Sequence, residues 1–167
     1  MRSLLALDPG LGGTGYALWL ARKRAEHARR HWAPDQAGVI DLRGDYAKEE
    51  WWVRCHTIAE LIKLLLPSER TNIVCEFTEY HQAAHRVMSW KTGDLQKLTF
   101  LSGVIYAVTR PNPFLPIVTS GWKGQLSKRL VEERIRKRLG RQTCERLGIK
   151  THAWDATGIG LWALGRF

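Results

Sequence analysis

The sequence is short of cysteine, of acidic residues and of long hydrophobic runs, and each shortage excludes a class of protein. Its three cysteines, Cys55, Cys75 and Cys144, lie far apart and form no C-x-x-C pair, which argues against a disulfide framework or a structural zinc site. No segment approaches the roughly 18 consecutive apolar residues that a membrane-spanning helix needs. Asp8 also ends the first apolar run far short of a secretory signal core. We therefore expect a cytoplasmic protein, in a reducing compartment, that has no membrane partner.

The shortage of acidic residues leaves a large positive charge. The 167 residues include 26 Lys and Arg against 16 Asp and Glu, which gives a net charge of +10 and a pI near 10. Such an excess attracts polyanions, because each neutralised phosphate also releases condensed counterions. Together with the eight tryptophans, the charge favours a nucleic-acid partner over the alternative of a solubilising surface.

The hydrophobic pattern predicts an α/β fold in a single domain, residues 1–167, because this length is typical of one domain. Apolar runs bounded by turn residues predict strands over residues 3–8, 14–20, 37–42, 72–78 and 115–119. Helical spacing and caps predict helices over residues 51–65, 94–109, 124–138 and 151–164, the last with Thr151 as its N-cap. This order indicates an antiparallel meander followed by βα crossovers, and hence a five-stranded mixed sheet flanked by helices.

Two acidic residues are associated with predicted strands. Asp8 ends the first strand before Pro9 and Gly10, where an aspartate is also ordinary turn chemistry. Glu76 is embedded among apolar neighbours, and a carboxylate buried in a strand must find a cation or shift its pKa. A buried salt bridge to Arg86 or Lys91 is the structural alternative.

A second pair of polar residues opens the last predicted helix. His152 and Asp155 are three residues apart and so share one helix face, although an acid in a first turn also complements the helix dipole. A divalent cation would satisfy Asp8, Glu76 and Asp155 together. Carboxylate sites for phosphate substrates commonly hold Mg²⁺, which Mn²⁺ can replace. Two such ions, about 3.5–4 Å apart, can activate water and stabilise a leaving oxygen.

A family resemblance is carried by Glu76 and by three motifs, LALDPGLGGTGYAL, LSGVIYA and HAWDATGIGLWAL. Through these residues the chain resembles the RuvC family of Holliday-junction resolvases over nearly its whole length. The resemblance implies an RNase H-like fold and a catalytic, metal-binding set of Asp8, Glu76, His152 and Asp155. His152 stands where Asp is commoner in the family, and either ligates a metal or moves a proton. The family acts as homodimers that nick two strands symmetrically, and the second helix, with Gly103, is our expectation for part of that interface.

The resemblance also implies residues that bind DNA. The family places a base-stacking aromatic residue three positions after the glutamate, but Glu79 stands there in this chain. Tyr80 or Phe77 is therefore expected to take that role. Family lysines after the fifth strand look similar to Lys123 and Lys128.

Basic residues continue from Lys128 and Arg129 to Arg138. We interpret them either as backbone phosphate contacts or as a solvated helix face. The tryptophans divide into an expected core group and a group that could equally stack on DNA or pack locally: Trp19, Trp51, Trp154 and Trp162 in the first, and Trp32, Trp90 and Trp122 in the second.

A glycine motif raises a competing interpretation. Residues 10–15 satisfy G-x-G-x-x-G, with Asp35 about 20 residues further on, as in dinucleotide-binding folds. Asp8 would repel a pyrophosphate, and the residues after Gly15 favour a strand over a helix, so we expect no nucleotide cofactor. Two alternatives to a junction resolvase stay open: a branched-DNA-binding module without catalysis, and an RNase H-like nuclease that cuts RNA–DNA hybrids.

Overall fold

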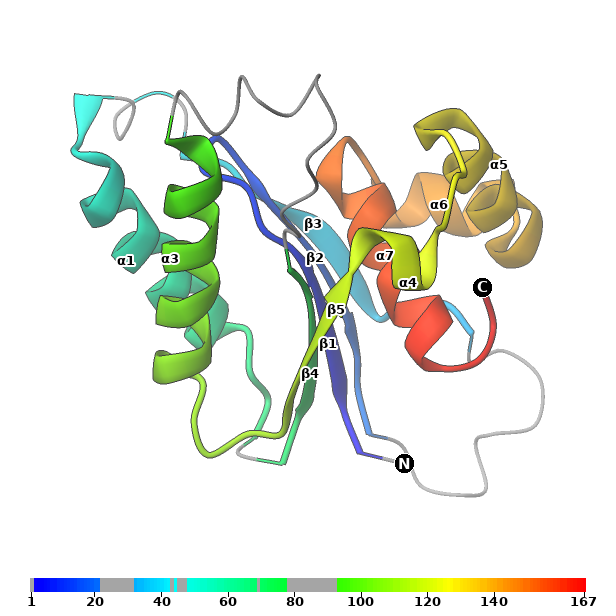
Figure 1. Ribbon diagram of the computed structural model, residues 1–167. Helices are drawn as coiled ribbons and strands as arrows, with labels where there is room; N and C mark the ends of the chain where they lie inside the picture. Colours follow the sequence, from blue (N-terminus) through cyan, green and yellow to red (C-terminus); the bar gives the residue numbers. More distant parts are fainter. Residues whose placement is uncertain (1, 22–31, 43, 45–47, 69, 78–92) are drawn as a thin grey trace.

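The computed structural model describes residues 2–21, 32–42, 44, 48–68, 70–77 and 93–167. Five strands form one mixed sheet in the order β3-β2-β1-β4-β5 (Figure 1). β2 is antiparallel to both β1 and β3, whereas β4 is parallel to both β1 and β5. The strands are β1 (Leu4–Asp8), β2 (Thr14–Trp19), β3 (Gln36–Ile40), β4 (Asn72–Phe77) and β5 (Phe114–Val118). The predicted α/β class and the five-stranded mixed sheet are confirmed.

The glycine motif forms a tight turn between β1 and β2. Asp8 pairs with Gly15 across the hairpin, so the chain returns directly as a strand. The Thr14 hydroxyl donates to the Gly10 carbonyl at 3.1 Å and accepts from the Gly10 amide at 3.3 Å, which closes the turn. A dinucleotide fingerprint requires a helix after the glycines, so this hairpin supports the sequence-based argument against a dinucleotide site.

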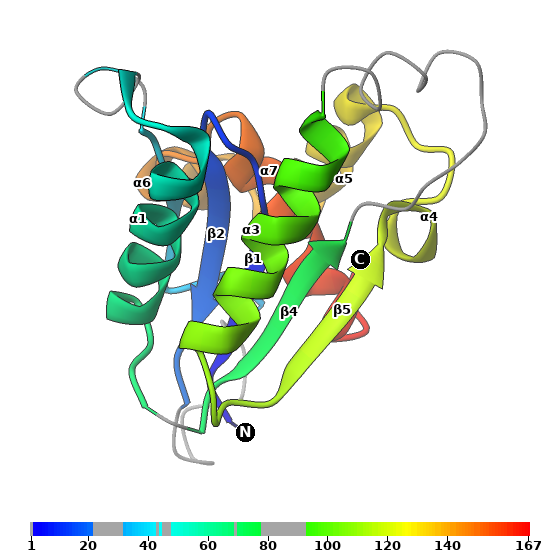
Figure 2. The ribbon, with the colours of Figure 1, turned by 60° about the vertical axis from the view of Figure 1, so that its left-hand side comes forward.

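Two long helices, α1 (Trp51–Leu64) and α3 (Asp94–Val108), cover one face of the sheet, as Figure 2 shows. Alternation along β1 points Leu5 and Leu7 toward them, into a core that also holds Cys55 and Cys75. Trp51 does not join this core: its side chain is 37% exposed, so its predicted core position is wrong. It lies at the first residue of α1 and contacts Phe100 edge-on instead.

The helix α7 (His152–Ala163) packs against the opposite face, beside α5 (Lys128–Leu139). Its glycines, which lower intrinsic helix propensity, permit this close packing. A Cβ on Gly160 would lie 2.1 Å from the ring of Trp19, and a Cβ on Gly158 would lie 2.6 Å from the ring of Trp122. Trp19 and Trp154 are buried in this second core, as the sequence predicts.

Several boundaries differ from the sequence-based expectations. The basic helix begins at Lys128 and not at Gly124, because Gly124 adopts a positive φ of 56° and the Ser127 side chain accepts from the Leu130 amide at 3.4 Å as the cap. The short helices α4 (Thr119–Trp122) and α6 (Arg141–Leu147) were not predicted, since one or two turns carry little periodicity. Thr151 precedes α7 but its side chain makes no capping hydrogen bond.

Cys55, Cys75 and Cys144 are all free and buried. In the part of the chain that the structure describes, no helix is long and apolar enough to cross a membrane. Arg86, Lys91 and Trp90 lie outside the described residues, and so does most of the basic stretch before β3.

Candidate active site

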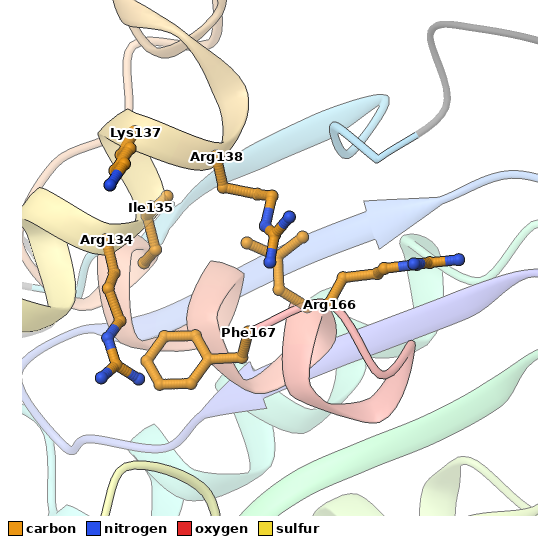
Figure 3. A pocket seen from close by; sticks show the side chains of 7 residues that line it. Arg134, Ile135, Lys137, Arg138, Arg166 and Phe167 are labelled. Carbon is orange, nitrogen blue, oxygen red and sulfur yellow. The ribbon is translucent and has the colours of Figure 1, made fainter.

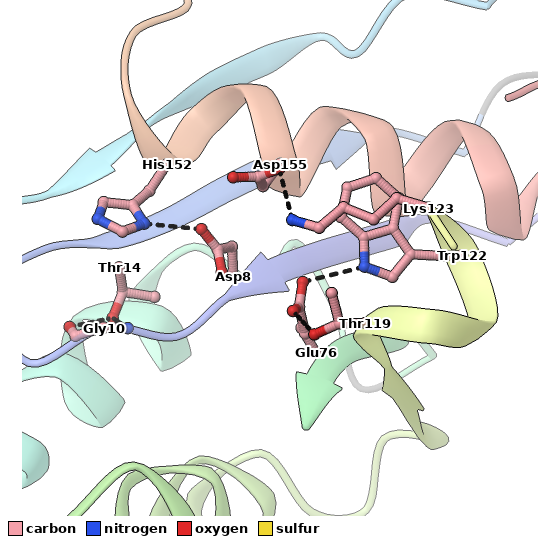
Figure 4. A network of polar contacts seen from close by, with 9 residues as sticks. All are labelled: Asp8, Gly10, Thr14, Glu76, Thr119, Trp122, Lys123, His152 and Asp155. Carbon is pink, nitrogen blue, oxygen red and sulfur yellow. Dashed lines mark hydrogen bonds and ion pairs between the residues drawn. The ribbon is translucent and has the colours of Figure 1, made fainter. Parts of the chain in front are cut away.

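Asp8, Glu76, His152 and Asp155 meet at one end of the sheet (Figure 4). Asp8 is the last residue of β1 and Glu76 lies near the end of β4. These strands are parallel neighbours, so their carboxyl ends lie at the same edge. Both side chains share the face of Ala6 and Val74, on which α7 packs, and the first turn of α7 supplies His152 and Asp155.

Asp8 and His152 contact each other directly, with 2.8 Å between Asp8 Oδ2 and His152 Nδ1. The backbone makes this contact possible because Gly15, opposite Asp8 in the hairpin, leaves room for the start of α7. A Cβ at Gly15 would lie 2.2 Å from the His152 carbonyl oxygen. A glycine is therefore required at this position for His152 to approach the end of β1 so closely.

Glu76 is held through both of its carboxylate oxygens. The Thr119 hydroxyl donates to Oε1, and the Trp122 indole N–H donates to Oε2 at 3.0 Å. Both donors belong to α4, which directly follows β5, the parallel neighbour of β4. Trp122 is only 4% exposed, so of the two roles considered for it, local packing is the one observed.

Asp155 is buried and pairs with Lys123, whose Nζ lies 3.2 Å from Asp155 Oδ1. Lys123 immediately follows α4, and its positive charge partly offsets the rise in pKa that burial causes at Asp8 and Glu76. The expected phosphate-binding lysine therefore lies among the carboxylates. It also lies over the ring of Trp122, 4.9 Å from the ring centroid.

The site raises the pKa of Asp8 and of Glu76. Burial is the main cause that raises the pKa of Asp8, the charge of Asp155 raises it further, and the hydrogen bond to His152 opposes both. Burial likewise raises the pKa of Glu76, with a smaller contribution from the charge of Asp8. The hydrogen bond to Asp8 raises the pKa of His152 despite its partial burial. The carboxylates thus repel one another in a place where water solvates them poorly.

The carboxylate oxygens and the imidazole of this site are suitable ligands for a hard divalent cation, although they are not assembled into a complete metal site. Among the residues that the structure describes, no three His, Cys, Asp or Glu side chains lie close enough together to hold a metal ion. Lys123, His152 and the α4 donors occupy the carboxylates instead. Burial is the main cause of the raised pKa of Asp8 and Glu76, and a bound cation would offset this cost as well as the smaller repulsion between the carboxylates. Carboxylate oxygens are the ligands that Mg²⁺ and Mn²⁺ prefer.

The other expected DNA-binding residues lie in different surroundings. Lys128, at the start of α5, is close enough to His152 for its charge to oppose in part the rise in the pKa of that imidazole that the hydrogen bond to Asp8 causes. Arg129 is exposed and bonds Glu133 at 3.0 Å, as a solvated helix face would. Tyr80 lies outside the described residues.

Thr119 and Trp122 are the site residues that the sequence analysis missed as partners of Glu76. Their position directly after a strand parallel to β4 was the available signal.

Comparisons with known proteins identify the fold. No family model matches the chain, and no curated protein sequence matches it. Among solved structures, RuvC of Thermus thermophilus in complex with a Holliday junction substrate is similar, with a TM-score of 0.68 and 16% identity over 99% of this chain and 96% of that one. A second Thermus thermophilus RuvC structure has a TM-score of 0.59 and 15% identity, covering 95% of this chain and 90% of the other. The chain therefore has the RNase H-like fold that its motifs predict.

Proposed function

We propose that this protein is a divalent-metal-dependent endodeoxyribonuclease that resolves four-way DNA junctions. The observation that carries the proposal is the meeting of Asp8, Glu76 and Asp155, from two parallel strands and one helix, beside His152 and Lys123. Binding alone does not need buried carboxylates in a chain with a net charge of +10. The fold shared with a RuvC whose structure contains a Holliday junction substrate supports the choice of DNA.

In this proposal Asp8, Glu76, Asp155 and His152 would hold Mg²⁺ or Mn²⁺, with two ions per site. Bound there, the metal ions would supply a water-derived nucleophile and stabilise the leaving oxygen of the phosphodiester. His152 bonds Asp8 through Nδ1, which leaves Nε2 for a metal or for a proton at the reacting phosphate. Lys123 pairs with Asp155 in the protein alone, and in this proposal it would contact a phosphate of the bound substrate.

Lys128, Arg129 and Tyr80 remain our proposed contacts to DNA outside the carboxylate cluster, with Tyr80 stacking on an unpaired base. Paired, symmetric nicks require a two-fold arrangement of two active sites, and we propose a homodimer for that reason. α3 is the proposed interface helix. Gly103 is open on its surface, and Phe100 and Tyr106 on the same helix are about two-fifths exposed. Such a protein would act on DNA in the cytoplasm.

One observation favours a second candidate, a branched-DNA-binding module without catalysis. Each carboxylate already has a partner within the protein, and no three-donor group is assembled among the described residues. A module that only binds DNA would keep Lys123 on Asp155 permanently. A nuclease would exchange that contact for metal.

The experiment is a cleavage assay on end-labelled substrates in Mg²⁺: a four-way junction, a linear duplex of the same sequence and an RNA–DNA hybrid. We expect cuts in the junction, at symmetric positions on two opposing strands, and an uncut linear duplex. Tight junction binding without cutting would favour the non-catalytic module. Cutting confined to the RNA strand of the hybrid would favour an RNase H-like enzyme.

A further inference from the structure

A basic pocket lies at the other end of α7 from the candidate active site. Its volume is about 390 Å³. Four basic side chains line it, Arg134, Lys137, Arg138 and Arg166, together with Phe167 (Figure 3). Leu161 also lines the pocket. Arg134, Lys137 and Arg138 belong to α5. Leu161 lies in the C-terminal part of α7, and Arg166 and Phe167 lie in the segment that follows it. Leu161 is six residues beyond Asp155, or about 9 Å along the helix axis.

Two of the three arginines that line the pocket, Arg134 and Arg166, lie over aromatic rings. The guanidinium carbon of Arg134 lies 5.5 Å from the ring centroid of Phe167, and that of Arg166 lies 3.7 Å from the ring centroid of Trp32. Arg136, on the same helix, lies 4.5 Å from the ring centroid of Trp154. In the described part of the chain, no ion pair involves Arg134, Arg138 or Arg166. Arg141 behaves differently, because it bonds Glu145 at 2.7 Å.

This way of holding an arginine has a chemical consequence. A ring attracts the flat face of the guanidinium, so the N–H groups at its edge stay available. A carboxylate partner would instead use those N–H groups and cancel the charge. Arginines held in this way lose less side-chain entropy on binding and offer planar, forked donors that match the oxygens of a phosphate.

We propose that this pocket binds backbone phosphates of a duplex DNA arm, away from the phosphodiester that is cut. DNA as the ligand rests on the proposed function, whereas the pocket's preference for phosphate rests on its own residues. Phosphate contacts outside an active site fix the register and orientation of the duplex and read no sequence. The pocket would therefore hold one arm of the substrate while the carboxylate cluster acts on another segment.

The experiment measures DNA binding in EDTA, by fluorescence anisotropy of a labelled junction and of a linear duplex, between about 50 and 200 mM salt. The test variant is Arg134→Gln with Arg138→Gln. Each lost phosphate contact reduces the slope of log affinity against log salt by about 0.9. We therefore expect a slope smaller by about 1 to 2, and binding weakened at least about fivefold at 100 mM salt on both DNAs.

A matched control removes the same charge elsewhere. Lys63→Gln with Arg141→Gln also removes two positive charges, from exposed side chains that already pair with Glu60 and Glu145. We expect this control to keep the native slope. Equal loss of slope in both double variants means that only overall charge matters, and it overturns the proposal. A native slope in the pocket variant overturns it as well. Because the substituted arginines are exposed, melting temperatures should match the native protein and show that folding is intact.

The binding assay separates this proposal from the proposed function. If the pocket variant has a smaller salt slope and the native protein cuts no DNA, the phosphate site is supported and the nuclease is refuted. If the native protein cuts junctions and the pocket variant binds DNA with the native salt slope, the nuclease is supported and the phosphate site is refuted. If the native protein binds neither DNA, both proposals fail.

Discussion

Replacing Gly15 by alanine should damage the candidate site through the backbone and without removing any of its chemical groups. The added Cβ would lie 2.2 Å from the His152 carbonyl oxygen and 2.4 Å from the carbonyl carbon. Both are backbone atoms at the start of α7, so no side-chain rotation relieves the clash. The start of α7 must move away from β2 by about 1.2 Å to restore an ordinary contact.

The structure sets the size of the effect. Forcing an extra carbon into a packed interior costs about 1–3 kcal/mol of stability. In a protein of this size, that corresponds to a melting temperature lower by roughly 2–12 °C. The same movement separates His152 Nδ1 from Asp8 Oδ2, which now lie 2.8 Å apart. Misplacing a catalytic group by about 1 Å can reduce a rate by about 100-fold.

The assay compares Gly15→Ala with Gly12→Ala, which changes the same turn. A Cβ at Gly12 meets no atom within 4 Å, and its φ lies outside the left-handed range, so its stability should stay within about 0.5 kcal/mol of native. Thermal melting and single-turnover junction cleavage should separate the two variants clearly. Two results would refute this reasoning: a Gly15→Ala variant that melts and cuts like the native protein, or a Gly12→Ala variant that is equally impaired. Either would mean that the close packing of α7 against β2 does not require a glycine at position 15.

Three further predictions concern charge in the candidate site. Asp8→Asn should melt above the native protein at neutral pH without metal, because burial raises the pKa of Asp8 and its charged form costs stability. This advantage should shrink as the pH falls below the raised pKa of Asp8, and a variant that melts lower at every pH would contradict it. By NMR titration, His152 should have a pKa above 6.5 in the native protein and a lower one in Asp8→Asn, since the hydrogen bond to Asp8 is the main cause of the shift. The stability that the Asp8–His152 pair contributes is then present at acidic pH and lost as the pH rises through the pKa of His152. Equal His152 titration curves in the native protein and in Asp8→Asn would argue against the contact. Lys123→Met should destabilise the metal-free protein by about 1–3 kcal/mol, because Asp155 loses its partner at a buried position, and Mg²⁺ should restore part of the loss. A melting temperature that does not respond to Mg²⁺ in this variant would contradict a metal site at Asp155.

Among the carboxylates, Glu76 breaks a local rule of the sequence, whereas Asp8 and Asp155 each had an ordinary structural explanation and were assigned mainly from the resemblance to the RuvC family. Glu76 interrupts an apolar strand, and an acid there has few inexpensive structural explanations. Strand alternation puts Glu76 on the sheet face opposite Cys75, and Cys75 packs in the core beneath α1 and α3. The meander followed by crossovers was readable for the same reason: strand and helix periods differ over most of the chain.

The partners of those carboxylates were not predictable, because they depend on tertiary contacts. Trp122 belongs to a four-residue helix, and only the alignment of β5 beside β4 brings its indole N–H to Glu76. Trp51 has the spacing of a core residue, yet it occupies the exposed first turn of α1, and spacing alone does not show where a helix leaves the sheet. The contacts between arginines and aromatic rings were not predictable either, because Arg166 and Trp32 are far apart in the sequence.

We propose above all that the carboxylate cluster hydrolyses junction DNA with divalent metal. The most direct measurement is single-turnover cleavage of a labelled four-way junction in Mg²⁺, Mn²⁺ and EDTA, by the native protein and by Asp8→Asn. We expect cleavage by the native protein in either metal, none in EDTA, and none by Asp8→Asn, which should still bind the junction. Cleavage that persists in EDTA, or an Asp8→Asn variant that cuts at the native rate, would contradict it.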